Sequence, residues 1–204
     1  MPQFPVVIRL LALAALLSAC ASQPPQSGRP LDWASQQQQL TKLDNWTLSG
    51  KVAVSSERGA NTARLRWIQR QDDLDLKLSG PVGMQQVTVQ RRGEQLTLLR
   101  NGRVESIAGG EELFVEEFGW SLPLDYLPWW LRGLPAPQTE PTATRFVDGH
   151  LQSLQQAGWN VEYLDYQTVE DYWLPRSIGF SRDQVKGKIL LKQWEIPQEA
   201  EPGD

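Results

Sequence analysis

Apolar and polar residues alternate along most of the middle of the chain. The clearest alternation falls in five runs, at residues 46–54, 62–67, 73–78, 86–90 and 96–98. A period of two is typical of strands that have one apolar face and one solvated face. Arg92-Gly93-Glu94 and Asn101-Gly102 lie after the later runs and favour hairpin turns. The pattern therefore predicts an antiparallel meander, which curls to enclose its apolar face.

The alternation returns in the last third of the chain, after a proline-bearing loop at 135–141. Trp159, Val161 and Tyr163 alternate with polar residues. Residues 175–181 and 185–194 are predicted to form a closing hairpin over the turn at 182–184. The polar tail at 197–204 is expected to fray.

Helical spacing appears before the first strand. Asp32 suits an N-cap, and apolar residues recur from Trp33 to Leu43. A short amphipathic helix is therefore predicted over 31–43, with the glutamine run at 36–39 interpreted as mainly a solvated face.

The middle of the chain carries a second helical region. Residues 111–118 place Leu113, Phe114 and Phe118 on one helical side. Residues 121–135 are apolar nearly all round and must be covered on at least one side. Pro128 is expected to divide this segment into two short helices, and Gly133 to end the second. These helices are candidates for a lid over the sheet.

The chain begins with a positive charge at Arg9, an apolar run at 10–17 and the tetrapeptide Leu17-Ser18-Ala19-Cys20. Such a segment is typical of a secretory signal and is shorter than the roughly 20 residues that span a bilayer. The tetrapeptide resembles a bacterial lipobox, which implies lipidation at Cys20. The alternative is an ordinary signal peptide cut near Ala19.

These features divide the chain. Residues 1–19 are predicted to be a signal peptide, 20–31 a lipidated end and flexible tether, 32–196 a single lipoprotein-binding domain, and 197–204 a polar tail. Ala21 follows the cysteine where an aspartate commonly signals inner-membrane retention, so an outer-membrane location is expected.

Composition argues for a binding protein and against an enzyme. Without residues 1–19 the net charge is 19 − 24 = −5, which is unfavourable for nucleic-acid binding. His150 is the only histidine, no nucleotide-binding GxxxxGK[ST] loop occurs, and neighbouring carboxylates are interpreted as solvated. We expect no catalytic residue, metal site or cofactor.

Residues 81–84 are unusual for a connection between two strands. Pro81, Val82, Gly83 and Met84 are apolar or small where a hairpin tip is normally polar. Exposed apolar surface favours a binding partner. The residues alone leave a second reading open, in which the tip folds back onto the domain.

Together, these features resemble the LolB family. The resemblance rests on six features: the lipobox at Cys20, the strand with central Gly50, the Gly80-Pro81-Val82-Gly83 tip, the run at 130–135, the strand at 158–161 with aromatic residues after it, and the closing strand that ends in Trp194. Val82 departs from the bulkier leucine that we associate with this family. The resemblance implies a mainly β fold with a helical lid: an incompletely closed antiparallel β-barrel whose short helices cover an apolar cavity.

The resemblance also implies a function. It predicts an outer-membrane receptor that takes lipoproteins from the periplasmic carrier LolA, binds their acyl chains and inserts them into the membrane, acting as a monomer. The tip 81–84 would contact the bilayer. The alternatives are a soluble LolA-type carrier and a structural outer-membrane lipoprotein that binds a protein partner. The predicted cavity residues face inward by alternation or lie in the lid: Trp46, Leu48, Leu65, Trp67, Leu76, Val87, Leu98, Phe114, Trp129, Trp159 and Val161.

Overall fold

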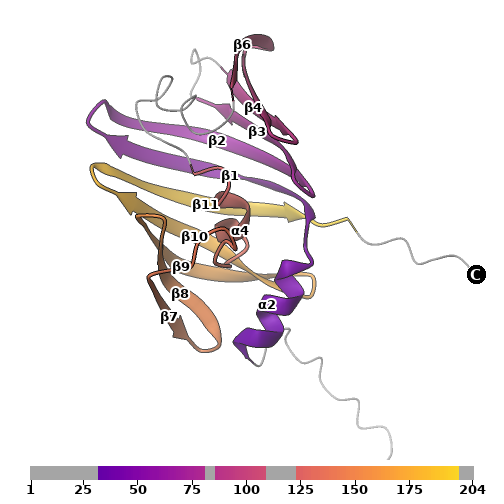
Figure 1. Ribbon diagram of the computed structural model, residues 1–204, viewed down its shortest axis with the longest axis vertical. Helices are drawn as coiled ribbons and strands as arrows, with labels where there is room; N and C mark the ends of the chain where they lie inside the picture. The colour runs from indigo at the N-terminus through magenta and orange to yellow at the C-terminus, as the bar shows by residue number, and fades with distance from the viewer. Residues whose placement is uncertain (1–31, 81–85, 109–122, 198–204) are drawn as a thin grey trace, which may run out of the picture.

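The computed structural model describes residues 32–80, 86–108 and 123–197, and these form one antiparallel sheet with two short helices (Figure 1). The helices are α2 (Trp33–Thr41) and α4 (Leu127–Leu131). The strands are β1 (Asn45–Ser56), β2 (Gly59–Arg70), β3 (Asp73–Ser79), β4 (Gln86–Arg92), β5 (Gln95–Arg100), β6 (Arg103–Ala108), β7 (Ala143–Val147), β8 (His150–Gln156), β9 (Trp159–Val169), β10 (Tyr172–Arg182) and β11 (Val185–Glu195).

The sheet consists of two meanders joined at the centre. Its strand order is β6-β5-β4-β3-β2-β1-β11-β10-β9-β8-β7, so the first strand pairs with the last. β6 and β7 are the two edges of the described sheet, which is therefore not closed into a complete barrel. Figure 1 shows the sheet curving, with α4 near its middle. The predicted fold class is confirmed in this respect.

The predicted alternation matches the burial of side chains along the strands. In β1, Trp46 and Leu48 are buried, whereas Lys51 and Ala53 are exposed. Gly50 occupies an inward position at a β-bulge between β1 and β11. A Cβ atom there would lie 2.1 Å from the backbone oxygen of Leu190, so the two strands can approach this closely only at a glycine.

The β7–β8 hairpin is absent from the sequence prediction. Its turn is Asp148-Gly149, with φ values of 51° and 79°, which is the Asp-Gly signal of a two-residue hairpin. The five residues of β7 are all exposed. Without a buried face this edge strand has no apolar alternation, and the turn dipeptide is the local signal that indicates it.

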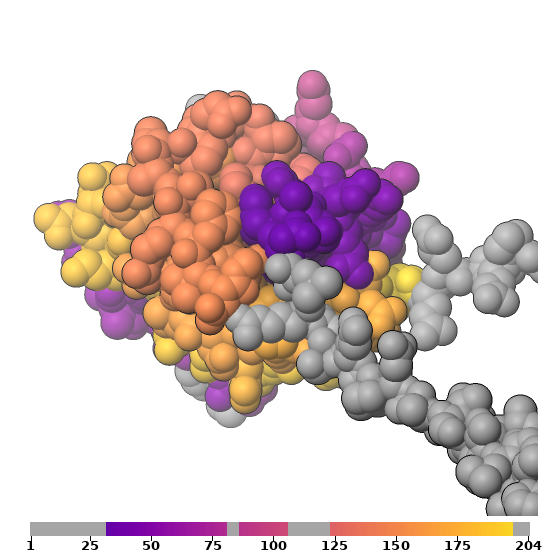
Figure 2. Space-filling view, turned by 90° about the horizontal axis from the view of Figure 1, so that it is seen from below, coloured from indigo at the N-terminus to yellow at the C-terminus, as the bar shows by residue number. Residues whose placement is uncertain are grey.

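The first helix forms as predicted, with one correction. The Asp32 carboxylate accepts a hydrogen bond of 2.9 Å from the backbone N–H of Ser35, which makes it the N-cap. Gln36 is buried, not solvated, and its Nε2 donates to the backbone oxygen of Trp173 at 3.2 Å. Figure 2 shows α2 in indigo, packed against the orange surface of later segments.

The second helical region is shorter than the predicted pair of helices. The residues expected to form a helix over 111–118 lie outside the described residues. Pro128 stands in the first turn of α4, where a missing N–H is tolerated, so it begins a helix and does not divide one. Gly133, with φ of +82°, follows α4 and ends it as predicted.

Candidate functional site

The concave face of the sheet gathers most of the predicted cavity residues into one apolar cluster. These residues come from both meanders, so the pairing of β1 with β11 is what unites them. Trp129 on α4 is half-buried against the same cluster. Phe114 lies outside the described residues. The buried members are Trp46, Leu48, Leu65, Trp67, Leu76, Val87, Leu98, Trp159 and Val161.

Three tryptophans form the centre of this cluster. The ring of Trp46 stacks on Trp67 with centroids 6.0 Å apart and contacts Trp194 at 5.2 Å. Trp67 donates from Nε1 to Gln69 at 2.8 Å. Among the described residues, the buried Nε1 atoms of Trp46 and Trp194 have no hydrogen-bond acceptor. A buried donor without a partner costs about 1–3 kcal/mol.

Arg132 fastens α4 to α2. Its Nε donates to the backbone oxygen of Pro128 at 2.9 Å, and its Nη1 donates to the backbone oxygens of Leu40 at 2.9 Å and Leu43 at 2.5 Å. The guanidinium also lies 4.6 Å from the ring centroid of Trp129. Burial lowers the pKa of Arg132 to about 10, which leaves it charged at neutral pH.

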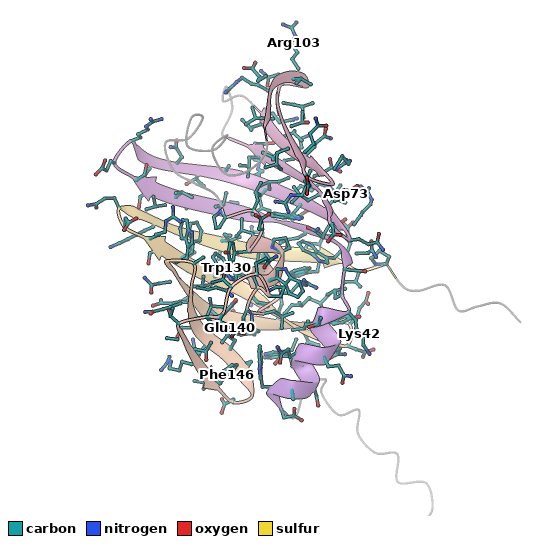
Figure 3. The ribbon with its side chains drawn as sticks, in the orientation of Figure 1. Lys42, Asp73, Arg103, Trp130, Glu140 and Phe146 are labelled. Carbon is teal, nitrogen blue, oxygen red and sulfur yellow. The ribbon has the colours of Figure 1, made fainter. Side chains whose placement is uncertain are left out.

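Gln156 forms hydrogen bonds with α4 and with the loop that follows it. This buried side chain on β8 accepts hydrogen bonds from Nε1 of Trp130 at 2.8 Å and from the backbone N–H of Ala136 at 3.0 Å. It donates to the backbone oxygens of Ala136 at 2.7 Å and of Thr139. Figure 3 shows Trp130 near the middle of the molecule. Sequence reasoning missed Gln156, because a buried glutamine leaves no signal in a polar stretch.

His150, the one histidine, has a packing role in this structure. Its ring lies edge-on to Tyr166 with centroids 4.5 Å apart. Tyr166 donates from its hydroxyl to the backbone oxygen of Leu151 at 2.5 Å, and burial raises the pKa of this phenol. Tyr166 also stacks on Trp173. These rings support the second meander beside α2.

A groove of about 800 Å³ opens between α4 and the ends of several strands. This volume lies within the range of roughly 300–1,000 Å³ that is common for ligand sites. Trp46, Leu96, Pro128 and Trp129 supply its apolar wall. The rim is largely polar, with Asp44, Asp72, Glu94, Asp125, Arg91 and Arg132 among its residues.

The groove and the cluster are adjacent but distinct. Of the predicted cavity residues that the structure describes, Trp46 and Trp129 border this groove, whereas the rest pack within the cluster. Trp129 is half-buried and Trp46 is 1% exposed, so Trp129 is the more accessible of the two from the groove. Access from the groove to the cluster requires α4 or the side chains beneath it to move.

The residues predicted to contact the membrane cannot be placed. Cys20, Pro81, Val82, Gly83 and Met84 lie outside the described residues, so their predicted roles are not tested by the structure. Within the described ranges, no helix has both the length and the apolar character needed to cross a bilayer.

Solved structures share this arrangement at low sequence identity. A LolA superfamily protein from Nitrosomonas europaea matches with a TM-score of 0.53 and 7% identity, covering 84% of this chain and 96% of that protein. A putative outer membrane lipoprotein-sorting protein domain from Vibrio parahaemolyticus matches with a TM-score of 0.52 and 8% identity, over 83% and 92%. The open curved sheet thus places the chain in the LolA-like fold class.

Sequence comparison identifies a family within this fold class. The family model "Outer membrane lipoprotein LolB" matches residues 44–194. The outer-membrane lipoprotein LolB of Pseudomonas fluorescens Pf-5 is 38% identical over 192 residues, covering 91% of this chain and 93% of that protein. The Pseudomonas putida W619 relative is 37% identical over 91% and 94%.

The chain belongs to the LolB family of outer-membrane lipoproteins. The resemblance seen in the sequence is confirmed by this membership. So are the outer-membrane location and, at the level of the family, the role of lipoprotein receptor in the lipoprotein localisation pathway.

Proposed function

We propose that this chain accepts lipoproteins from the periplasmic carrier LolA and inserts them into the outer membrane. The observation that carries the proposal is the apolar cluster on the concave face of an open sheet, in a chain that belongs to the LolB family. Burying acyl chains there stabilises the complex by about 0.8 kcal/mol per CH₂ group. No catalytic step is part of this proposal.

The acyl chains enter through the groove beside α4. Trp46 and Trp129 guide them, because both border the groove and both belong to or contact the apolar cluster. The chains then displace side-chain contacts beneath α4, while Arg132 and Gln156 keep that segment attached to α2 and β8. An ester or amide carbonyl of the lipid can accept a hydrogen bond from the unpaired indole N–H of Trp46.

Two segments supply the membrane contacts in this proposal. Lipidation of Cys20 anchors the receptor, since stable anchoring requires more than one acyl chain and bacterial lipoproteins carry three. The tip 81–84, with Val82 at its apex, contacts the bilayer and delivers the cargo. The support for the tip is its apolar composition between two strands.

Reconstituted transfer to liposomes tests this division of roles, with receptor-bound cargo and inserted cargo scored separately. We expect Val82→Glu to fold and to accept cargo from LolA but to fail at insertion, because a carboxylate resists entry into the membrane interface. Val82→Leu is the matched control and should insert cargo at least as well as the parent. Normal insertion by Val82→Glu would contradict the role of the tip.

A separate extraction tests acyl binding itself. The parent receptor, incubated with lipidated cargo and purified, should retain acyl chains that organic solvent releases. A receptor that retains none, yet co-purifies with a protein partner, would instead be a structural lipoprotein.

A further inference from the structure

The convex face of the sheet carries a group of basic residues that the proposed function does not use. Its members are Lys51 on β1, Arg64 and Arg66 on β2, Lys77 on β3, and Lys186 and Lys188 on β11. We call this group the basic face. All six residues are exposed, and they occupy four adjacent strands. The whole chain has a net charge of −4, so the basic face is a local reversal of the overall charge.

Strand register proves that these side chains share one side of the sheet. Lys77 lies directly opposite Arg66, and Arg64 lies directly opposite Lys51. Directly opposite residues of an antiparallel pair project from the same face. Two like-charged pairs therefore face each other across neighbouring strands, which lowers the stability of the folded chain.

Cations outnumber carboxylates on the convex side of these strands. Asp73 and Asp75 project from the same side of β3 as Lys77. Asp75 already pairs with Arg70 at 3.4 Å and with Arg92 at 2.9 Å.

Within the described ranges, the one ion pair of the basic face joins Arg66 to Glu195 at 3.9 Å, with both side chains about half exposed. An exposed pair of this kind is worth about 0–1 kcal/mol. Glu162 on β9 lies two strands from Lys188, with Gly179 of β10 between them.

Other acidic residues lie at the edges of this region. Glu57 and Asp183 are in turns at the strand ends, each next to an arginine in the sequence, Arg58 and Arg182. Because these carboxylates lie outside the basic face and next to arginines, they leave most of the charge of the basic face uncompensated.

Small side chains lie between many of the cations. Alternating outward positions on the central strands are small: Ser49, Ala53 and Ser55 on β1, and Gly179 and Ser181 on β10. Long basic side chains project past these small residues and are spread over four strands. This spread of positive charge fits a broad anionic surface such as a membrane better than it fits a single small anion.

The position of the basic face in the molecule points to the same partner. Arg64 lies opposite Ser79, the last residue of β3, and Ser79 pairs with Gln86, the first residue of β4. The connection between these strands contains the tip 81–84. Arg100 and Arg103 lie at this same end of the sheet, because the backbone N–H of Asn101 donates to the oxygen of Gln86. Figure 3 shows Arg103 at one end of the molecule and Asp73 well away from it.

The opposite ends of the strands carry both charges, with Arg70, Arg91 and Arg92 in ion pairs with carboxylates there. Asp72 and Asp73 lie at the β2–β3 turn and Glu94 at the β4–β5 turn, close to the groove. The basic face therefore extends toward the end where the tip emerges, whereas the groove lies at the other end of the strands.

We propose that the basic face lies against the anionic phospholipid headgroups of the membrane that anchors the chain. This contact would orient the receptor so that the tip end meets the bilayer and the groove stays open to the periplasm. This inferred contact extends the proposed function. Its part in delivering cargo rests on that proposed function. Each basic residue close to an anionic surface strengthens binding roughly five-fold.

The test measures the distance of this face from headgroups in the full, lipidated chain. Cys20 is the only cysteine, so a cysteine introduced at Ala53 can be labelled uniquely after lipidation. The labelled receptor is reconstituted into vesicles that contain a lipid with a headgroup nitroxide as fluorescence quencher. The control label is placed at Glu140, an exposed residue in the loop after α4.

In vesicles of phosphatidylglycerol and phosphatidylethanolamine, we expect quenching at position 53 to exceed that at 140 by roughly two-fold or more. The ratio of quenching at position 53 to quenching at position 140 should fall toward one in phosphatidylcholine. It should also fall in about 1 M salt, where the Debye length is about 3 Å. Lys51→Glu/Lys188→Glu should abolish the excess. Lys42→Glu/Arg145→Glu makes the same change in net charge away from the basic face and should preserve it.

Equal quenching at the two positions, or no effect of Lys51→Glu/Lys188→Glu, would overturn the proposal. Protection of the label at 53 by the soluble carrier, with no response to vesicles, would also overturn it and assign the basic face to an acidic protein surface. Cargo transfer is scored in the same vesicles. Normal transfer without headgroup proximity removes this inference alone, whereas proximity with failed insertion counts against the proposed delivery mechanism.

Discussion

The concave and convex faces of β2 are built from alternating neighbours and meet opposite environments. Leu65 and Trp67 are buried in the apolar cluster, whereas Arg64 and Arg66 are exposed among other cations. On the concave side, cross-strand neighbours such as Trp67 and Leu76 pack together. On the convex side, Lys77 opposes Arg66 and repels it. One strand thus carries two surfaces, and each is suited to a different contact.

The difference between the two faces indicates where the sheet tolerates substitutions. Apolar burial holds the concave face together, so its residues carry both stability and the proposed acyl binding. The convex face contributes little to stability, and its like-charge pairs even oppose folding. Substitutions of the same chemistry should therefore have different consequences on the two faces.

The largest expected difference is between neighbouring charge substitutions. Trp67→Glu places a carboxylate in the apolar cluster, which costs several kcal/mol unless the carboxylate is neutralised. We expect loss of folding or of acyl binding, measured by urea unfolding and by retention of acyl chains. Arg66→Glu should fold and retain acyl chains. If Arg66→Glu impairs acyl binding as strongly as Trp67→Glu, the assignment of the two faces is wrong.

A second comparison concerns arginines. Arg132→Met leaves the backbone oxygens of Leu40, Leu43 and Pro128 without this donor and should lower the free energy of unfolding by about 2–5 kcal/mol. Arg64→Met on the convex face should change it by no more than about 0.5 kcal/mol. Chemical denaturation measures both. Equal effects would mean that the hydrogen bonds of Arg132 do not hold α4 to α2.

A third and smaller difference in stability is expected between alanine substitutions at two glycines. Gly50→Ala forces a Cβ atom toward the backbone oxygen of Leu190 and should destabilise the fold by about 1–3 kcal/mol. In Gly179→Ala, the added Cβ would meet its nearest atoms at 3.9 Å, which is ordinary contact. The outward glycine should therefore accept alanine with little change in melting temperature. Destabilisation of both to the same degree would show that the inward bulge imposes no special constraint.

The sequence predicted most of the sheet but not its edge. Strands such as β1, β2 and β3 have one buried face, so their apolar alternation reveals them. β7 has no buried residue, and only its Asp148-Gly149 turn indicates it. The pairing of β1 with β11 joins residues more than 130 positions apart, and no local pattern specifies it.

The candidate site was predicted unevenly for the same reason. Inward residues such as Trp46 and Val161 follow from period two, and the structure places both in the apolar cluster. The buried contacts of Gln36, Arg132 and Gln156 depend on partners that lie far away in the sequence. A polar residue in a polar stretch gives no sign that folding will bury it.

Site-specific photo-crosslinking tests the central claim, that the concave face holds the acyl chains. A benzophenone amino acid is introduced singly at positions 64, 65, 66 and 67, and each receptor accepts a lipidated cargo from LolA before irradiation. The account predicts crosslinks to the acyl chains at 65 and 67, and background signal at 64 and 66. Crosslinks of equal yield at all four positions, or at 64 and 66 alone, would contradict it.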